Sequence, residues 1–186
     1  SAIPPTYLPA APTLASYRGV FAQRPFGRYL LNSLVVALGA TLLALVTGAP
    51  AAYALARLRP PGADAWRAGF LAFALFPPAV LLAPLYSVAR NLGLVNSLTG
   101  LAAVHAALHL PFAVWMLEAA FRAVPVELEE AARVDGFTRL GAFVRVVVPL
   151  AAPSLGAAAL LVFIFSWNEF VIALTFLARD ELRTVP

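Results

Sequence analysis

Charge is scarce in this sequence of 186 residues, because only 12% of them are charged whereas 62% are hydrophobic. Soluble domains carry about 25% charged and about 45–50% apolar residues. A soluble protein of this length could not cover its surface with so few charges. The composition therefore predicts a protein whose main solvent is the lipid bilayer.

Cysteine is absent, which excludes disulfides, thiolate metal sites and thiol nucleophiles. Lysine is absent too, and the net charge of +4 is spread over several loops, so we expect no nucleic-acid partner. The sequence order reveals no serine, histidine and acid arrangement and no phosphate-binding glycine loop. We therefore expect neither an enzyme nor a cofactor bound by this chain.

Long stretches without any charge occur four times, and each exceeds the roughly 20 residues that a helix needs to cross about 30 Å of hydrocarbon. They lack the alternation of a barrel wall, and a large soluble helical core is the alternative. We interpret the chain as an all-α membrane protein, a polytopic helical bundle with one membrane domain over 29–178. The predicted spans lie near 29–56, 68–89, 98–120 and 152–178.

Two short segments, 1–28 and 179–186, flank this domain. The first holds five prolines, which predict an extended lead-in rather than a signal peptide. The sequence begins without methionine and stops at Pro186 without a polar tail. Both ends look cut, so we expect the sequence to be a piece of a longer protein.

Small residues and prolines mark the predicted spans. Gly39, Ala40 and Gly48 predict close packing of the first span against its neighbours. Pro50 and the pair Pro77-Pro78 are expected to kink or interrupt their helices, which is tolerated where other protein segments satisfy the freed backbone groups. These features favour a packed bundle over separate anchors, and they occur in transport and structural bundles alike.

Two histidines in the third span, His105 and His109, have the i, i+4 spacing of a zinc pair. A metal site needs a third ligand, and the nearest acid, Glu118, lies more than two helical turns further on. We expect these histidines to serve in helix packing or to lie at the membrane interface, and the chain to bind no metal.

Polar residues enter the last span at Ser166, Asn168 and Glu169. An acid inside a membrane is costly, so it should face the protein interior or water. We consider two roles for these side chains, lining a translocation path and hydrogen bonding to another helix.

Charge gathers again between the third and fourth spans, in the segment 121–150. Pro125 suits a first helical turn, and the acids after it place negative charge at the positive end of the helix dipole. Gly136 suits a left-handed stop, and Thr138 can cap a second helix until Pro149 marks the return to the membrane. The pattern predicts a helix-turn-helix outside the bilayer, which we interpret as a docking site rather than a solvated loop.

The residues from Ala131 to Leu140 are expected to fill a groove on the partner. The loop residues assigned to docking are Glu130, Ala131, Ala132, Asp135, Gly136, Phe137, Leu140 and Pro149. The two alanines allow close approach, and the glycine adopts a backbone conformation that costs other residues about 1 kcal/mol or more. Glu130 is expected to anchor the segment electrostatically to Arg133 or Arg139.

The same segment resembles the EAA motif of ABC importer permeases, through Glu130-Ala131-Ala132, Gly136 and Pro149. The family usually has isoleucine and leucine before the proline, where this sequence keeps the apolar character with valines. Further blocks in the same order are similar to the sugar (maltose-type) permeases, in particular their second permease subunit. They are NSLVVA at 32–37, AAYALARL at 51–58, PLYSVARNLGL at 84–94, PFAVW at 111–115, PLAAP at 149–153, SWNEF at 166–170 and the closing RTVP.

This resemblance implies a membrane subunit of six helices, of which the chain covers helices two to five. The implied partners are a second permease subunit, two ATPase subunits that carry ATP and Mg, and an extracytoplasmic solute-binding protein. The resemblance also implies an inner-membrane location, with both chain ends outside and the loops 57–67 and 121–150 in the cytoplasm. Counted alone, the arginines show only a weak bias, seven inside against six outside.

The expected function is therefore that of the permease subunit of an ATP-driven sugar importer, with 121–150 as the loop that couples it to the ATPases. A permease for another solute, such as a polyamine or phosphate, is the alternative within transport. A membrane scaffold that moves nothing and an intramembrane enzyme are alternatives of other classes. The enzyme would need a paired acid or a histidine-rich metal site.

Overall fold

The computed structural model describes residue 19 and residues 25–185, and these residues form helices and connecting loops without any strand. Most of the predicted lead-in over 1–28 therefore lies outside the described residues. The helices within the four predicted spans are α2 (Phe26–Tyr53) with its π-helical end η1 (Ala54–Leu58), α3 (Ala63–Ala74), α4 (Pro78–Asn91), α5 (Leu98–Ala123), α9 (Ala152–Asn168) and α10 (Val171–Phe176). Between α5 and α9 lie α6 (Val126–Val134), α7 (Arg139–Ala142), the π-helical turn η2 (Phe143–Val147) and α8 (Val148–Leu150), and η3 (Asp180–Leu182) is a final short 3-10 turn.

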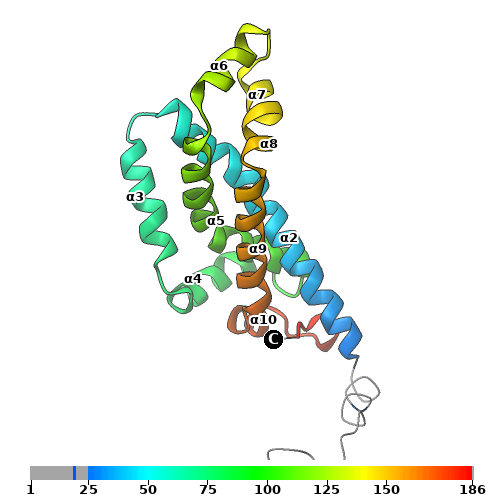
Figure 1. Ribbon diagram of the computed structural model, residues 1–186. Coiled ribbons are helices and arrows are strands. Elements are labelled where there is room, and N and C mark those ends of the chain that lie inside the picture. The colour runs from blue at the N-terminus through cyan, green and yellow to red at the C-terminus, as the bar shows by residue number, and fades with distance from the viewer. Residues whose placement is uncertain (1–18, 20–24, 186) are drawn as a thin grey trace, which may run out of the picture.

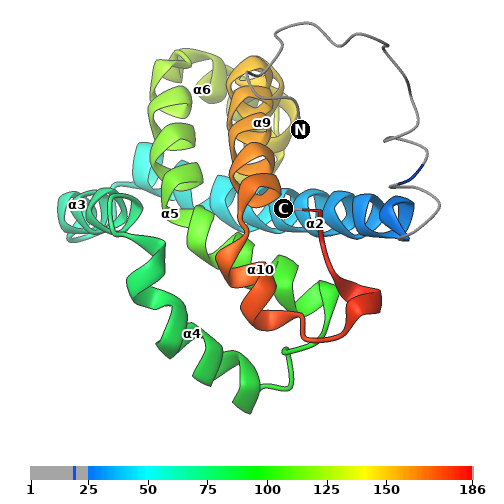
Figure 2. The same cartoon turned by 90° about the horizontal axis from the view of Figure 1, so that it is seen from below.

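The core of the bundle is the contact of α2 with α5 and α9. Helix α2 runs obliquely across these two helices in Figure 1 and crosses them again in Figure 2. Small residues allow this close approach. A Cβ atom on Gly39 would lie 3.2 Å from the Cβ of Ala102, and one on Gly48 would lie 3.3 Å from Leu110. The predicted close packing of the first span is confirmed.

Two helices are long and apolar enough to cross a membrane unaided, over Phe26–Leu58 and Leu98–Ala123. Two further spans exist if each of two bent pairs counts as one: α3 with α4, bent by 100°, and Arg139–Leu150 with α9, bent by 77°. Exposed leucine and valine side chains on the outer face of α2, such as Leu38 and Leu42, suit contact with lipid or with another apolar partner. The structure is thus that of a polytopic α-helical membrane protein.

The run 68–89 is broken where the sequence placed Pro77-Pro78. Helix α3 ends at Ala74, Pro77 is extended with ψ 119°, and α4 starts with Pro78 in its first turn. A proline ring disfavours helical geometry in the preceding residue, and proline is well placed at the start of a helix. Pro50, in contrast, lies inside α2, which continues to Tyr53 before it widens into η1.

The run 152–178 is also two helices, although no proline divides it. The backbone of Glu169 is extended, with ψ 109°, and it separates α9 from α10. Its carboxylate then accepts hydrogen bonds from the backbone N–H groups of Ile172 and Ala173, at 2.8 and 3.3 Å. An acid that caps backbone donors in this way starts a new helix.

The two ends of the described chain lie at the same end of the bundle, opposite α6 and α7 (Figure 1). The side chain of Asn32 donates to the carbonyl oxygens of Glu181 and Arg183, at 3.1 and 2.9 Å. The backbone N–H of Val185 donates to the hydroxyl of Ser33 at 2.9 Å. These contacts fix the closing segment against the start of α2.

Candidate functional site

The segment between α5 and α9 forms the helix-turn-helix that the sequence predicts. Helix α6 ends in a left-handed turn at Gly136, whose φ is 93°. The N–H groups of Gly136 and Phe137 donate to the carbonyls of Arg133 and Ala132, both at 3.1 Å. The Thr138 hydroxyl then accepts from the N–H of Gly141, also at 3.1 Å, and so caps α7. The glycine stop and the threonine cap are both confirmed.

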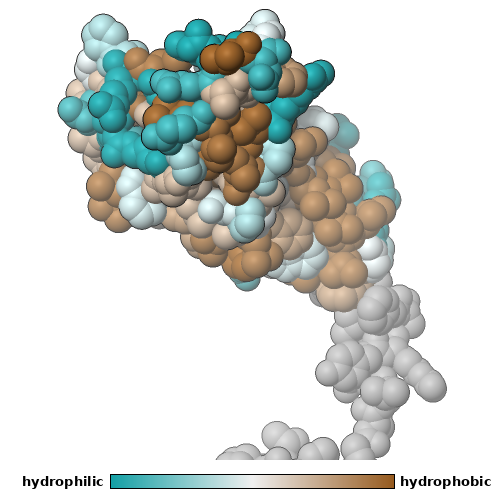
Figure 3. All heavy atoms as spheres, turned by 45° about the horizontal axis from the view of Figure 1, so that its top comes forward, coloured by the Kyte–Doolittle hydropathy of each residue, from teal (hydrophilic) through white to brown (hydrophobic). Residues whose placement is uncertain are grey.

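The tip of this helix-turn-helix exposes apolar side chains among charges. Val134 is 88% exposed and Leu140 70% exposed. Hydrophilic side chains gather at this end of the molecule, and hydrophobic patches interrupt them (Figure 3). Exposed apolar groups rimmed by polar ones are typical of a protein interaction surface.

The inner face of α6 is held to α2 by Glu129, and not by Glu130. Glu130 is exposed, and among the described residues no ion pair joins it to Arg133 or Arg139. Glu129 is 6% exposed, accepts a hydrogen bond from the Tyr53 hydroxyl and lies 3.2 Å from Arg57. The anchoring role expected of Glu130 is therefore wrong, because the helix turns that residue outward and its neighbour inward.

A second buried charge cluster joins α2, α3 and α5 at the same end. Glu118 lies 2.8 Å from Arg67 and 2.7 Å from Arg122, and Arg67 also donates to the carbonyl of Leu55 at 2.7 Å. Sequence reasoning missed both clusters. The signal was present, because an acid within the end of a charge-free run, such as Glu118, requires a basic partner nearby.

The three candidate path residues lie at the end of α9 in different surroundings. Ser166 is 4% exposed, and its hydroxyl lies 2.8 Å from Nδ1 of His105. Glu169 caps α10 and lies 3.8 Å from Nε2 of the same histidine. Asn168 is exposed, and its amide donates to the carbonyl of Ile164 at 2.8 Å.

Ser166, His105 and Glu169 thus form a serine, histidine and acid cluster that the sequence order did not reveal. A catalytic triad needs an accessible serine at Nε2 of the histidine and donors for an oxyanion. Here the serine contacts Nδ1 and is buried, and the acid is engaged by the backbone of α10. We therefore interpret the cluster as a buried hydrogen-bonded contact, the α5–α9 lock, that holds these two helices together. In the described part of the chain no three histidine or acid side chains gather closely enough to hold a metal ion.

A cavity of about 630 Å³ opens beside this lock, where α3, α4, α5 and α9 meet. His109, Asn168 and Glu169 supply polar atoms to its wall. Phe112, Phe165 and Trp115 are among its aromatic residues, and the rings of His109 and Phe165 lie 5.7 Å apart. Aromatic walls with a few polar groups are typical of small-molecule sites.

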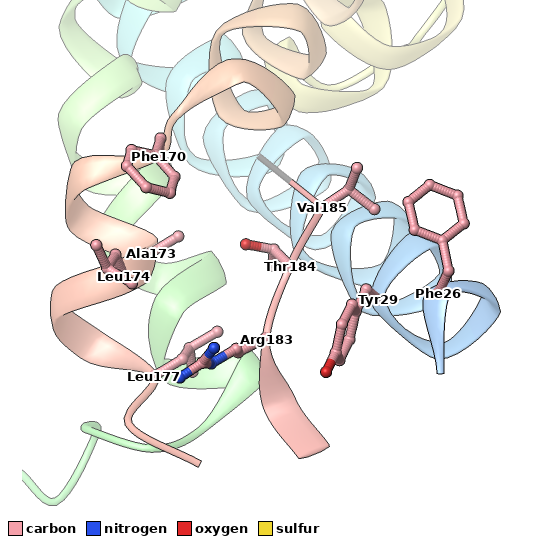
Figure 4. Close-up of a pocket in the computed structure, with 9 residues that line it drawn as sticks. All are labelled: Phe26, Tyr29, Phe170, Ala173, Leu174, Leu177, Arg183, Thr184 and Val185. Atoms are coloured by element: carbon pink, nitrogen blue, oxygen red, sulfur yellow. The ribbon is translucent and has the colours of Figure 1, made fainter. Parts of the chain in front are cut away.

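A smaller cavity of about 340 Å³ lies at the end opposite α6, between the start of α2, α10 and the closing segment. Figure 4 shows Tyr29 on one side of it, Phe170 and Leu174 on another, and Arg183 and Thr184 from the closing segment. The guanidinium of Arg183 is already paired with Asp180 at 2.9 Å.

The comparison with known families decides what this bundle is. Residues 44–184 match the family described as the binding-protein-dependent transport system inner membrane component. The chain belongs to this family. The predicted permease-type fold is confirmed by a solved bacterial ABC transporter involved in the import of the acidic polysaccharide alginate. That structure has a TM-score of 0.82 and 26% identity to this chain, and the match covers 94% of this chain and 61% of the other.

Two similar proteins are named as permeases for sugar compounds. The sequence is 43% identical to the sulfoquinovosyl glycerol transport system permease protein SmoH of Agrobacterium fabrum, over 98% of this chain and 64% of the relative. It is 42% identical to the trehalose transport system permease protein SugB of Mycobacterium tuberculosis, over 96% of this chain and 65% of the relative. This chain therefore spans about two thirds of the length of these two permeases.

Proposed function

We propose that this permease is a membrane subunit of an ATP-driven importer that carries a sugar or oligosaccharide across the inner membrane. The relatives named as permeases for trehalose and sulfoquinovosyl glycerol support the sugar class. In this proposal, a second permease subunit completes the path and an extracytoplasmic binding protein delivers the solute. Two ATPase subunits hold the ATP and Mg, so the chain itself needs no cofactor and catalyses no reaction.

The coupling element of this importer is the loop 121–150. The observation that carries this proposal is the exposed apolar tip of α6 and α7 on a buried charged base. In this arrangement Ala131, Asp135 and Leu140 face a groove on an ATPase, and Gly136 sets the angle between the two short helices. Glu130 points outward and is placed to contact the partner, while Ala132 and the half-buried Phe137 support the loop from within the chain. Pro149 is exposed and lies in α8, where the chain returns towards α9.

The solute path runs past the cavity between α3, α4, α5 and α9. Aromatic rings can stack on the apolar faces of a sugar, while the amide of Asn168 and the carboxylate of Glu169 can bind its hydroxyl groups. Ser166 contributes to this site indirectly, because its hydroxyl holds His105 beside Glu169.

The test is uptake by the assembled importer in proteoliposomes, with its binding protein and ATP. We expect ATP-dependent uptake of a sugar such as trehalose. Replacing Asn168 by alanine should reduce uptake about tenfold, because one hydrogen bond contributes a net free energy of up to about 1.5 kcal/mol. Leu42→Ala, on the exposed outer face of α2, is the matched control and should transport normally. Uptake of a polyamine or phosphate, with none of any sugar, would overturn the sugar assignment. An assembled complex that moves no solute would identify a scaffold.

A further inference from the structure

Three side chains connect α6 to the end of α2, and we name them the α2–α6 strut: Tyr53, Arg57 and Glu129. Tyr53 is the last residue of α2, Arg57 lies in the π-helical turn η1, and Glu129 lies on the inner face of α6. The side chains of Arg57 and Glu129 are only 12% and 8% exposed. The strut is therefore a desolvated charge pair between a membrane helix and the proposed coupling loop.

Glu129 and Arg57 each use two atoms in the contacts of the strut. The Tyr53 hydroxyl donates to Oε1 of Glu129, and Nε of Arg57 lies 3.2 Å from Oε2 of the same carboxylate. The other end of the guanidinium donates to the carbonyl of Val124 at 2.5 Å, just before α6 begins. The start and the middle of α6 are thus both tied to the end of α2.

Tyr53 also contacts the second leg of the loop. Its ring lies 4.4 Å from the ring of Phe143 in η2, and that ring lies 5.6 Å from Phe121 in α5. One residue of α2 therefore touches α6 through its hydroxyl and the return leg through its ring. A displacement of either leg must displace Tyr53 or break a buried contact.

Two π-helical turns lie at or beside the strut, one at the end of α2 and one in the return leg of the loop. Arg57 lies in the π-helical turn Ala54–Leu58, and Phe143 begins the π-helical turn Phe143–Val147. Such turns are rare and occur frequently at functional sites in helices. Their wider winding sets the positions of Arg57 and of Phe143, the ring that packs on Tyr53.

We infer that the α2–α6 strut passes movement of the coupling loop to α2, so that Glu129, Arg57 and Tyr53 are positioning residues for transport. The inference rests on the proposed function of the loop 121–150. When an ATPase displaces α6, separating the strut would leave a buried charge without its partner, which is strongly unfavourable. The end of α2 therefore follows α6, and α2 carries the displacement into its contacts with α5 and α9.

The second charge cluster supplies a matched control. Glu118 is 7% exposed, close to the 6% of Glu129, and it is likewise paired with arginine. Within the described part of the chain, Glu118 pairs with Arg67 of α3 and with Arg122 of its own helix α5, and not with a residue of α6. A substitution of Glu118 thus perturbs a similar buried charge while leaving the strut in place.

The experiment compares Glu129→Gln, Tyr53→Phe and Glu118→Gln in the complete importer, purified with its ATPases and reconstituted with binding protein and trehalose. The quantity measured is solute transported per ATP hydrolysed, on equal amounts of assembled complex. We expect this ratio to fall about tenfold in both strut variants, within the roughly 5–150-fold range typical of coupling free energies. Glu118→Gln should keep the wild-type ratio even if its yield is lower.

A wild-type ratio in Glu129→Gln and Tyr53→Phe would overturn the inference while leaving the proposed function intact. An equal fall of the ratio in Glu118→Gln would also overturn the inference, because the loss of any buried charge at this end would then have the same effect. Failure of the proposed function is recognised separately, since the wild-type complex itself would then move no solute. Tyr53→Phe keeps the ring contact with Phe143, so it tests the hydroxyl even if the charge variant does not assemble.

Discussion

At the scale of single residues, the direction of one side chain decides its role. Glu129 and Glu130 are adjacent acids on α6, yet the first is buried against Tyr53 and Arg57 and the second is exposed. The sequence pattern places both acids near the start of a helix, so it cannot predict which of the two is buried and which is exposed. The distinction comes from the packing of α6 on α2, a contact between segments far apart in the chain.

At Gly136 the backbone conformation predicts the effect of a substitution. Its φ of 93° is costly for any side chain, by about 1–2 kcal/mol and more for a β-branched one. We expect Gly136→Val to leave membrane insertion intact but to reduce retention of the ATPase subunits, and transport with it. The measurement is co-purification of the ATPases with the permease, followed by uptake in proteoliposomes.

Gly156→Val is the control for this experiment. A Cβ at either glycine meets nothing within 4 Å, but Gly156 lies in helix α9 without a positive φ. The two variants therefore differ in backbone strain and not in steric space. Normal transport by Gly136→Val, with the ATPases bound, would show that this turn is not the coupling element.

At the scale of elements, the sequence predicted the helices well and their interruptions unevenly. Charge-free runs mark α2 and α5, and Pro77-Pro78 marks the break between α3 and α4. The break between α9 and α10 was not foreseen, because no proline or glycine marks it. It depends on Glu169, whose carboxylate satisfies backbone donors of α10 only in the folded chain.

The candidate site also combines features that the sequence predicted with features that it did not. The glycine turn and the threonine cap are local features, so the sequence alone predicted them. The strut and the serine, histidine and acid cluster join residues more than 60 positions apart in the chain. Such pairs depend on how helices are arranged, and no local pattern specifies them.

The contact of α2 with α5 gives a prediction about packing. Gly39→Leu would drive a branched side chain into Ala102, where even a Cβ would lie only 3.2 Å away. Overpacking of this kind costs about 1–3 kcal/mol, so we expect a lower Tm for the purified importer in detergent. Gly27→Leu is the control on the same helix, because nothing lies within 4 Å of a Cβ there. Equal Tm values for the two variants would contradict the close α2–α5 contact.

At the scale of the whole molecule, the bundle has two different ends. The end with α6 and α7 carries the two buried charge clusters and the exposed apolar tip. The opposite end holds the start of α2, the loop before α5 and the closing segment, tied by hydrogen bonds such as that from the N–H of Ala178 to Asn96. Among the described residues, the exposed apolar tip therefore distinguishes the α6 end, which is the end that the proposed function assigns to the ATPase partners.

This polarity predicts the topology in the membrane. Residue 62 lies between η1 and α3 at the α6 end, and residue 94 lies between α4 and α5 at the opposite end (Figure 1). A reporter that is active only in the cytoplasm should give signal when inserted at residue 62 of the full-length protein and none at residue 94. Both insertion points lie in loops, so membrane insertion should tolerate them. The reverse pattern would place α6 and α7 outside the cell, where no ATPase can reach them, and the loop 121–150 could then not couple hydrolysis to transport.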